Sequence, residues 1–525
     1  MGRKLINHPI YTIVYVTFFF FVVLPIIYTL GSSFFSDGLI KNIQLLLNLK
    51  TFILLIKSCV VAFFIALSST LFGTMLGFLL YKTDILFRPF FKISLLIPLF
   101  ISPYIMAVAW KDFFFMLFNS TGFVYSYIGV ILVLTITFTP LSMLIVGSAL
   151  SNINVQLEES GFIITKFRRV ILKIIFPLIK PALISSFVLV FIFSISEFSV
   201  PAFFGIKVFT TEIFTRFSAF YNHSLAILQS TLLIMICVLL LFAERKHIAD
   251  APFLSVGSKG VSNELYTMKN RNRLSLIFLF GWFFISILSP FIILIAQSFK
   301  DGTSKIIQAF ELLIPTFSNS IGLAFAGALI IVFIGLIVAY FSVKQTGTKK
   351  IRSFDWILLI VFAIPSTIFG ISLIKFYNQP ILDFIYSSYA IILIGYIGKF
   401  SFISAKLIGN SIKQIPDSLD EVAQIEGIKF FTRTRKILIP LIMPSLFASF
   451  VITFIFSLGE LGITIMLYPP GTEIMPIKVY TIMANAPQSL TSSMTLIVFS
   501  VTLLIIVGFY FIGKLFTINR RYLND

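Results

Sequence analysis

The chain has 525 residues, of which 58% are hydrophobic and only 12% are charged, and its mean hydropathy is +1.03. A soluble domain carries about 25% charged residues and could not bury this much apolar surface, so the composition excludes a soluble enzyme, a disordered scaffold and a secreted disulfide module. The 40 Lys and Arg residues against 21 Asp and Glu give a formal charge of +19, which in a membrane protein indicates basic cytoplasmic loops rather than a nucleic-acid partner.

Continuous apolar runs, each long enough to cross a bilayer as a helix, follow one another along the chain. Because these runs do not alternate between apolar and polar residues, they are not the strands of a barrel. We therefore predict an all-α membrane protein with about 12 transmembrane helices. The runs fall near residues 10–31, 58–81, 93–118, 124–149, 182–204, 225–243, 274–298, 320–343, 355–377, 384–405, 444–468 and 490–513.

Basic residues gather in alternate loops between these runs. The segments 166–180, 244–273 and 406–436 are especially basic, as are the residues before the first run and after the last. By the positive-inside rule, these loops and both termini are cytoplasmic, which agrees with an even number of spans. The first run reaches about residue 31 without a small-x-small cleavage site, so we expect a retained span rather than a signal peptide.

The second half of the chain repeats features of the first half in the same order. The segment Phe193-Ser-Ile-Ser-Glu-Phe198 corresponds to Phe456-Ser-Leu-Gly-Glu-Leu461 at an offset of 263 residues, and Pro103 corresponds to Pro365 at an offset of 262. Each half has six spans that begin inside, which predicts two parallel six-helix repeats about an axis along the membrane normal. We place the first half at 1–243, a polar cytoplasmic linker at 244–273 and the second half at 274–525.

The loop between the tenth and eleventh runs has a defined spacing. Counting from Glu421, Ala423 lies at +2, Gly427 at +6 and Pro440 at +19. A short helix ended by Gly427, a turn and a second helical segment would form a rigid knob in water. An ordinary amphipathic helix-turn-helix is the alternative, but the pattern resembles the Glu-Ala-Ala loop of ATP-binding-cassette importer permeases.

The equivalent loop of the first half is less regular. Counting back from Pro177 by the same spacing gives Glu158, followed by Glu159, and Ser160 holds the small +2 position. Ile164 occupies the glycine position, so either the turn is reshaped or the register slips locally.

The resemblance implies that each loop carries a coupling helix that docks on one of two ATP-binding subunits at the cytoplasmic face. The chain has no Gly-x-x-x-x-Gly-Lys-Ser/Thr sequence, so we expect it to be no enzyme and to bind no cofactor directly, while its partner subunits use ATP. The resemblance also implies an external solute-binding protein, membrane lipid around the spans and a bacterial inner membrane as the location.

Two fused halves resemble the ferric-iron permease group, and three segments, 98–110, 196–205 and 459–473, favour iron as the substrate. Thiamine, phosphonate and polyamine remain alternative substrates of the same architecture. An ion-coupled secondary transporter fits twelve spans but not the paired loops, and a membrane scaffold or sensor without transport is a further alternative.

Carboxylates inside apolar runs are costly, so Glu197 and Glu460 are candidate pathway residues that could attract a cation. Alternatively, each lies near the outer interface and bonds a backbone amide or a lysine. Lys399 lies within a span and could pair with a glutamate, while Pro103 and Pro365 are candidate hinges. The histidines and cysteines show no metal-ligand spacing, so we expect no metal site and no catalytic residue.

Overall fold

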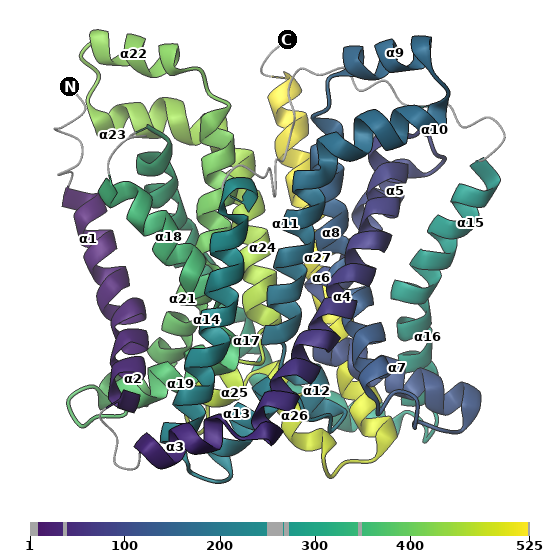
Figure 1. Cartoon of the computed structure of the whole chain (residues 1–525), viewed down its shortest axis with the longest axis vertical. Helices are drawn as coiled ribbons and strands as arrows, with labels where there is room; N and C mark the ends of the chain where they lie inside the picture. Colours follow the sequence, from purple (N-terminus) through teal and green to yellow (C-terminus); the bar gives the residue numbers. More distant parts are fainter. Residues whose placement is uncertain (1–8, 35–38, 249–265, 267–271, 345–348, 523–525) are drawn as a thin grey trace.

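The computed structural model describes residues 9–34, 39–248, 266, 272–344 and 349–522 (Figure 1). Within these ranges it is helical, with a single isolated bridge between Thr83 and Tyr266 and no strand. The described part contains ten helices that are long and apolar enough to cross a membrane, or twelve if each of two bent pairs counts as one span. The prediction of an all-α membrane protein with about 12 spans is therefore confirmed.

The first half contains the following helices and π-helical turns (η) in chain order. They are α1 (Pro9–Phe18), η1 (Phe19–Val23), α2 (Leu24–Phe34), α3 (Leu39–Leu46), α4 (Leu49–Lys82), α5 (Arg88–Ser94), α6 (Ile97–Phe100), α7 (Pro103–Phe118), α8 (Tyr127–Ser151), α9 (Val155–Ile164), α10 (Phe167–Val170), η2 (Ile171–Ile175), α11 (Phe176–Ser196), α12 (Ser199–Phe203), α13 (Phe209–Ser218) and α14 (His223–Ile248).

The second half follows the same plan. Its elements are α15 (Asn272–Phe283), η3 (Phe284–Leu288), α16 (Ser289–Ser298), α17 (Ser304–Lys344), α18 (Lys349–Ala363), α19 (Ser366–Tyr377), α20 (Asp383–Tyr386), α21 (Tyr389–Lys413), α22 (Asp417–Ile425), α23 (Phe430–Arg433), η4 (Thr434–Leu438), α24 (Ile439–Gly459), α25 (Thr464–Leu467), α26 (Met475–Met483) and α27 (Gln488–Tyr522).

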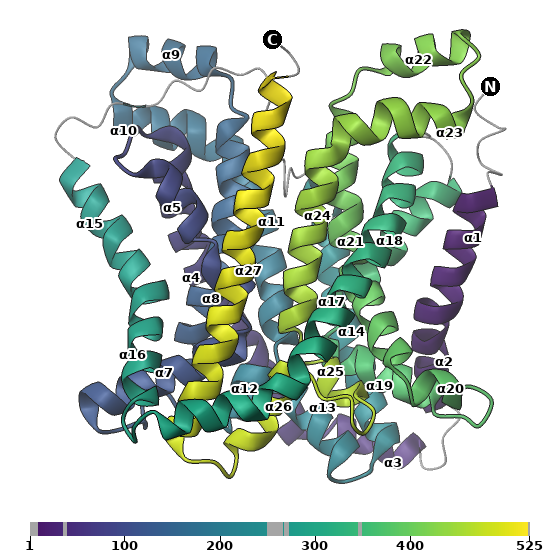
Figure 2. The same cartoon turned by 180° about the vertical axis from the view of Figure 1, so that it is seen from behind.

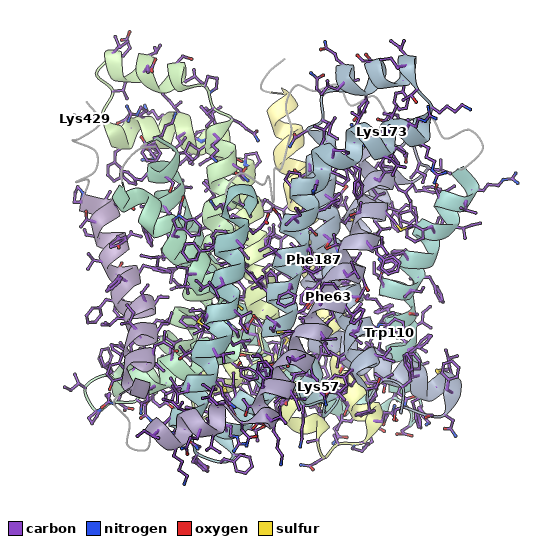
Figure 3. All side chains as sticks on the ribbon, in the orientation of Figure 1. Lys57, Phe63, Trp110, Lys173, Phe187 and Lys429 are labelled. Carbon is purple, nitrogen blue, oxygen red and sulfur yellow. The ribbon has the colours of Figure 1, made fainter. Side chains whose placement is uncertain are left out.

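The two ends of the molecule differ in charge and shape. The short helices α9 and α22 stand at one end, where α1 begins and α27 ends, while α3, α12, α13 and α26 lie at the opposite end (Figures 1 and 2). Figure 3 shows Lys173 and Lys429 at the end that carries α9 and α22. The two most basic loops within the halves thus lie on one side, as the positive-inside rule requires.

The repeat is visible in the closest helix crossings. In the first half α4 crosses α8 where a Cβ on Gly73 would lie 2.4 Å from Ser142 Cβ. In the second half α17 crosses α21 where a Cβ on Gly335 would lie 2.6 Å from Ser404 Cβ. Small residues allow two helices to approach this closely when lipid supplies no hydrophobic driving force between them. The same contact therefore holds the helix pair at the centre of each half.

The first membrane helix of each half packs on the opposite half. The ring of Tyr11 in α1 lies 5.0 Å from Phe341 of α17, measured between centroids, and Tyr377 of α19 donates its hydroxyl to the Phe21 carbonyl at 3.0 Å. Conversely, Phe280 of α15 lies 4.9 Å from Phe91 of α5. Figures 1 and 2 show α1 beside α18 and α15 beside α5. The two sequence halves are therefore interlocked in space.

The runs expected at 93–118 and 355–377 are not single kinked helices. The chain bends by 97° between Arg88–Phe100 and Pro103–Phe118, and by 107° between Phe354–Ala363 and Ser366–Tyr377. Proline lacks the N–H that a continuous helix needs, and it restricts the residue before it to extended backbone. Pro103 and Pro365 therefore mark complete breaks, and α7 and α19 turn away from the spans that precede them.

Enlarging Gly73 or Gly335 should force the crossing helices apart. We expect Gly73→Ala and Gly335→Ala each to lower stability by about 1–3 kcal/mol, the usual cost of overpacking. Thermal unfolding of the purified protein in detergent measures the effect. Gly322→Ala is the control, because a Cβ there would meet nothing within 4 Å. Equal melting temperatures for all three variants would contradict the close packing.

Candidate functional site

A cavity of about 190 Å³ lies between the two halves. Both helix breaks contribute to its wall, through Ser102 and Pro103 from one half and Ser366 from the other. The ends of α11 and α24 complete it, and Glu197 and Glu460 line it together. Residues that are 263 positions apart in the sequence thus face one space near the axis of the repeat.

Each glutamate follows the last residue of a long helix and caps the short segment after it. Glu197 Oε1 accepts a hydrogen bond from the Ser199 backbone N–H at 2.8 Å and another from the Ser199 hydroxyl. Glu460 Oε1 accepts from the Ile463 N–H at 2.9 Å. Each carboxylate thus bonds a backbone amide and also lines the central cavity. The amides stabilise the charged form of carboxylates that are otherwise surrounded by apolar side chains.

Lys399 of α21 also lines this cavity, with only 6% of the residue exposed. Its ammonium donates to the backbone carbonyls of Phe362 at 3.0 Å and Ile364 at 2.7 Å. These carbonyls lie where α18 stops before Pro365, so the break leaves them without helical partners. No ion pair joins Lys399 to a glutamate in the described ranges. Lys399 thus stabilises the break.

Two buried serines line the cavity together with Thr137, Ser366 and Lys406, and the sequence analysis did not identify these residues. The hydroxyls of Ser102 and Ser196 have no hydrogen-bond partner among the described residues. Ser102 precedes Pro103 at the start of α7, and a serine before a proline inside an apolar run was the available signal. Together with the glutamates, these oxygens can attract a cation or hydrogen-bond a polar solute. No group of three or more His, Cys, Asp or Glu in the described residues could hold a metal ion permanently.

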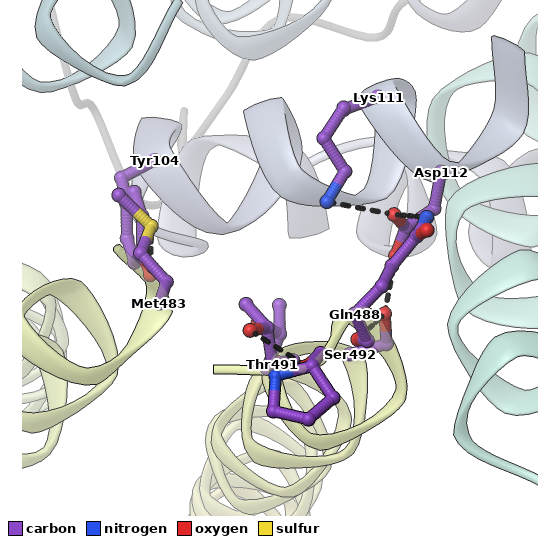
Figure 4. Close-up of polar contacts among 9 residues, drawn as sticks. Tyr104, Lys111, Asp112, Met483, Gln488, Thr491 and Ser492 are labelled. Carbon is purple, nitrogen blue, oxygen red and sulfur yellow. Dashed lines mark hydrogen bonds and ion pairs between the residues drawn. The ribbon is translucent and has the colours of Figure 1, made fainter. Parts of the chain in front are cut away.

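A second polar cluster joins the halves near the end opposite α9 and α22 (Figure 4). The buried carboxylate of Asp112 in α7 accepts hydrogen bonds from Gln488 Nε2 at 2.6 Å and from the Ser492 hydroxyl, both in α27. Lys111 lies 3.0 Å from the same carboxylate. Because these three partners satisfy the carboxylate, the cluster holds α7 against α27 and offers no free ligand. The sequence analysis did not identify Asp112, whose hydrogen-bond partners in α27 lie more than 370 residues away.

The second-half loop has the predicted helix-turn form. Gly427 has φ +70°, a left-handed conformation that glycine adopts without strain, and the Ile428 N–H donates to the Ala423 carbonyl at 3.0 Å. This is the Schellman arrangement that ends a helix, here α22. Ala423 is buried and Glu421 is exposed. Pro440 lies in the first turn of α24, directly after the π-helical turn η4.

The first-half loop keeps a similar outline with a different turn. After α9 the chain becomes extended at Thr165, which has φ −148°, and no left-handed residue ends the helix. Of the two interpretations open from the sequence, the turn is reshaped. Pro177 holds the same place in α11 that Pro440 holds in α24. Glu159 and Ser160 are exposed on α9.

Glu158 differs from its exposed neighbours because it is only 2% exposed. Its Oε1 lies 2.5 Å from Lys82 Nζ at the end of α4, and its Oε2 accepts the hydroxyl hydrogen of Tyr266. Burial and the adjacent Glu158 carboxylate raise the pKa of Tyr266 above its ordinary range. The phenol therefore remains protonated and donates at physiological pH.

The tips of both loops expose large apolar side chains. On α9, Ile163 is 87% exposed and Ile164 is 84% exposed, and on α22, Val422 is 58% exposed and Ile425 is 83% exposed. Apolar side chains on a water-facing, highly charged loop indicate a surface that another protein covers. The two tips stand at the same end of the molecule (Figure 2).

The chain is similar in sequence to known transport proteins. Residues 69–249 and 331–517 each match the family described as binding-protein-dependent transport system inner membrane component. An Fe(3+)-transport system permease protein of Haemophilus influenzae is 25% identical over 88% of this chain and 91% of its own length. A ferric transport system permease protein of Actinobacillus pleuropneumoniae is 24% identical over 90% of this chain and 73% of its own length. A putative 2-aminoethylphosphonate transport system permease protein of Salmonella typhi is 24% identical over 37% of this chain and 73% of its own length.

Removing the Lys399 ammonium should destabilise the break before Pro365. Lys399→Met leaves the Phe362 and Ile364 carbonyls buried without donors, at a cost of about 1–3 kcal/mol for each unsatisfied group. We expect a lower melting temperature for the purified variant. Lys57→Met, at an exposed lysine of α4, is the matched control, and a melting temperature equal to that of the control would contradict this role.

Proposed function

Because the chain belongs to the family of binding-protein-dependent transport system inner membrane components, we propose that it is the permease that carries ferric iron in an ATP-driven importer. Its family makes it a multi-pass inner membrane component of a transport system that includes an ATPase and a binding protein. The observation that carries the iron assignment is the length of the similarity. The two ferric relatives align with 88% and 90% of the chain and so span both halves, whereas the phosphonate relative aligns with 37%.

The chemistry of the central cavity supports a hard cation as the substrate. Carboxylate oxygens are hard ligands, and Glu197 and Glu460 place one from each half on the same space. Two carboxylates are fewer than a ferric ion binds in a stable site, so we infer that iron is held only briefly on its way through. The Ser102 and Ser196 hydroxyls offer further oxygen ligands during that passage.

The exposed tips of α9 and α22 support docking of partner subunits that hydrolyse ATP. We infer that each tip docks in an apolar cleft of one of two ATP-binding subunits on the cytoplasmic side, where both termini also lie. Closure of those subunits around ATP would draw the two loops together and rock the halves. The solute-binding protein would deliver iron at the opposite end, and the breaks at Pro103 and Pro365 are suited to act as hinges because they line the cavity.

A phosphonate substrate is the second candidate, because a phosphonate relative matches part of the chain. Thiamine and polyamine remain further candidates for the same architecture. Uptake of radiolabelled ferric iron by iron-starved cells with and without this chain tests the proposal, with labelled thiamine and 2-aminoethylphosphonate measured in parallel. If iron uptake persists after deletion and uptake of one of the other compounds is lost, that compound is the substrate and the permease architecture still applies.

Charge reversal at Glu421 should block coupling and leave insertion intact. Glu421 is exposed on α22, so lysine there would oppose docking of the ATP-binding subunit without disturbing a buried contact. We expect Glu421→Lys to reduce iron uptake to the level of cells that lack the chain, at unchanged membrane abundance. Glu311→Lys, at an exposed acid of α17, is the control for charge reversal. Normal uptake by Glu421→Lys would contradict the coupling role.

Neutralising either cavity glutamate should weaken the attraction for a trivalent cation. Glutamine keeps an oxygen that can accept the backbone N–H but removes the charge. A loss of about 1.4 kcal/mol in the attraction for the cation, which a low-dielectric cavity permits, lowers its affinity about tenfold. We therefore expect Glu197→Gln and Glu460→Gln each to lower iron uptake by about tenfold or more. Aspartate variants, which keep the charge, should retain more uptake than the glutamine variants. If the glutamine variants take up iron as fast as the wild type, these carboxylates do not serve the pathway.

A further inference from the structure

The link between the halves is anchored to the first half at Tyr266. The Tyr266 N–H donates to the Lys82 carbonyl at 2.8 Å, and the Asp84 N–H donates to the Tyr266 carbonyl at 3.3 Å. The ring of Tyr266 packs between the two helices of the first loop. Its centroid lies 5.3 Å from that of Phe162 in α9 and 5.6 Å from that of Phe167 in α10. Tyr266 therefore contacts the end of α4 and the first coupling loop at the same time.

The polar centre of this contact is a buried triad of Lys82, Glu158 and Tyr266. Lys82 has no exposed surface and Glu158 is 2% exposed. One oxygen of the carboxylate faces the ammonium at 2.5 Å, and the other accepts the phenol hydrogen. Loss of one partner from a buried ion pair leaves an uncompensated charge, so the three side chains stabilise one another as a unit.

The second half attaches its loop differently. Glu421, the residue equivalent to Glu158, is exposed on α22. There the buried Arg433 donates to the Tyr340 hydroxyl of α17 at 3.3 Å. Two glutamates at equivalent positions of the repeat thus have different environments, one facing water and one buried against the link between the halves.

The triad also gives α9 a direct connection to the centre of its half. Through α10, η2 and α11, a displacement of α9 reaches the cavity along the chain. Through Glu158 it reaches the end of α4, the helix that crosses α8 at Gly73. A rigid hydrogen-bonded contact transmits displacement only while its members keep their geometry.

We propose that Lys82, Glu158 and Tyr266 are positioning residues for energy coupling, and that Tyr266 holds the first coupling helix against α4 so that both move together. This inference rests on the proposed function, because it assigns α9 to an ATP-binding subunit. Under it, the two coupling loops are not interchangeable: Glu421 is available to a partner, whereas Glu158 is committed to the interior of the chain.

The test uses the chain reconstituted in liposomes with its ATP-binding subunits and a ferric-loaded binding protein. Tyr266→Phe removes one hydroxyl and keeps the ring packing. We expect the ATP hydrolysed per iron transported to rise by at least about threefold, the factor that loss of one hydrogen bond of modest net strength produces. Tyr510→Phe, at a half-exposed tyrosine of α27, is the matched control and should keep the wild-type ratio.

A double variant tests whether the residues act as a unit. Glu158→Gln alone should raise the ratio at least as much as Tyr266→Phe, and the double variant should be no worse than Glu158→Gln, because the phenol has then already lost its charged acceptor. Additive effects would show two independent contacts and would overturn the inference. Glu159→Gln removes the same charge from the adjacent exposed position, and the Tyr266→Phe effect should persist undiminished in its presence.

The outcomes separate this inference from the proposed function. A wild-type ratio in Tyr266→Phe, with normal iron uptake by the wild type, overturns the inference and leaves the iron permease standing. No iron uptake by the wild-type complex overturns the proposed function, and the inference is then judged on ATP hydrolysis without substrate. A change of at least about threefold in that basal rate in Tyr266→Phe supports it, on the same hydrogen-bond estimate, and an unchanged rate overturns it.

Discussion

In the hydrocarbon of a bilayer, a backbone N–H or C=O that leaves a helix finds no water, so an interrupted helix needs other protein groups to complete its hydrogen bonds. The breaks of this protein gather around one cavity, and its charged side chains supply the missing partners there. Lys399 bonds the carbonyls ahead of Pro365, while Glu197 and Glu460 bond the amides that follow α11 and α24. The groups that permit the irregular backbone are therefore the same groups that give the cavity its polarity.

The repeat preserves the elements that form the cavity and varies those that surround it. Both halves keep the glycine–serine crossing, the proline break and the glutamate after the long helix. Lys399 has no charged counterpart in the first half, where the position 263 residues earlier is Ile136. The loops that carry α9 and α22 differ too, because Glu421 is exposed and Glu158 is buried.

The packing of the first helix of each half on the opposite half affects how the two halves can move. Helix α1 packs on α17 and α18, and α15 packs on α5, so each half carries a helix of the other along its outer side. At the end opposite the coupling loops, Asp112 ties α7 to α27. A rocking motion that opens the cavity must keep or repack these contacts. They limit the halves to a small set of relative positions, because packed interfaces are bistable rather than continuously deformable.

The amino-acid sequence by itself determined the approximate number of spans, the repeat, the helix-turn form at Gly427 and the matched positions of Glu197 and Glu460. Each of these follows from local hydropathy, charge or spacing, which a single chain segment carries. Only the tertiary structure decided that Pro103 and Pro365 break their spans completely and that Lys399 bonds backbone carbonyls. It also decided that the first helix of each half packs on the opposite half. It also decided that Glu158 is buried by Tyr266, which lies 108 residues further along the chain. These outcomes depend on side chains from distant segments competing for the same buried polar groups, and no local pattern encodes which segment is the partner.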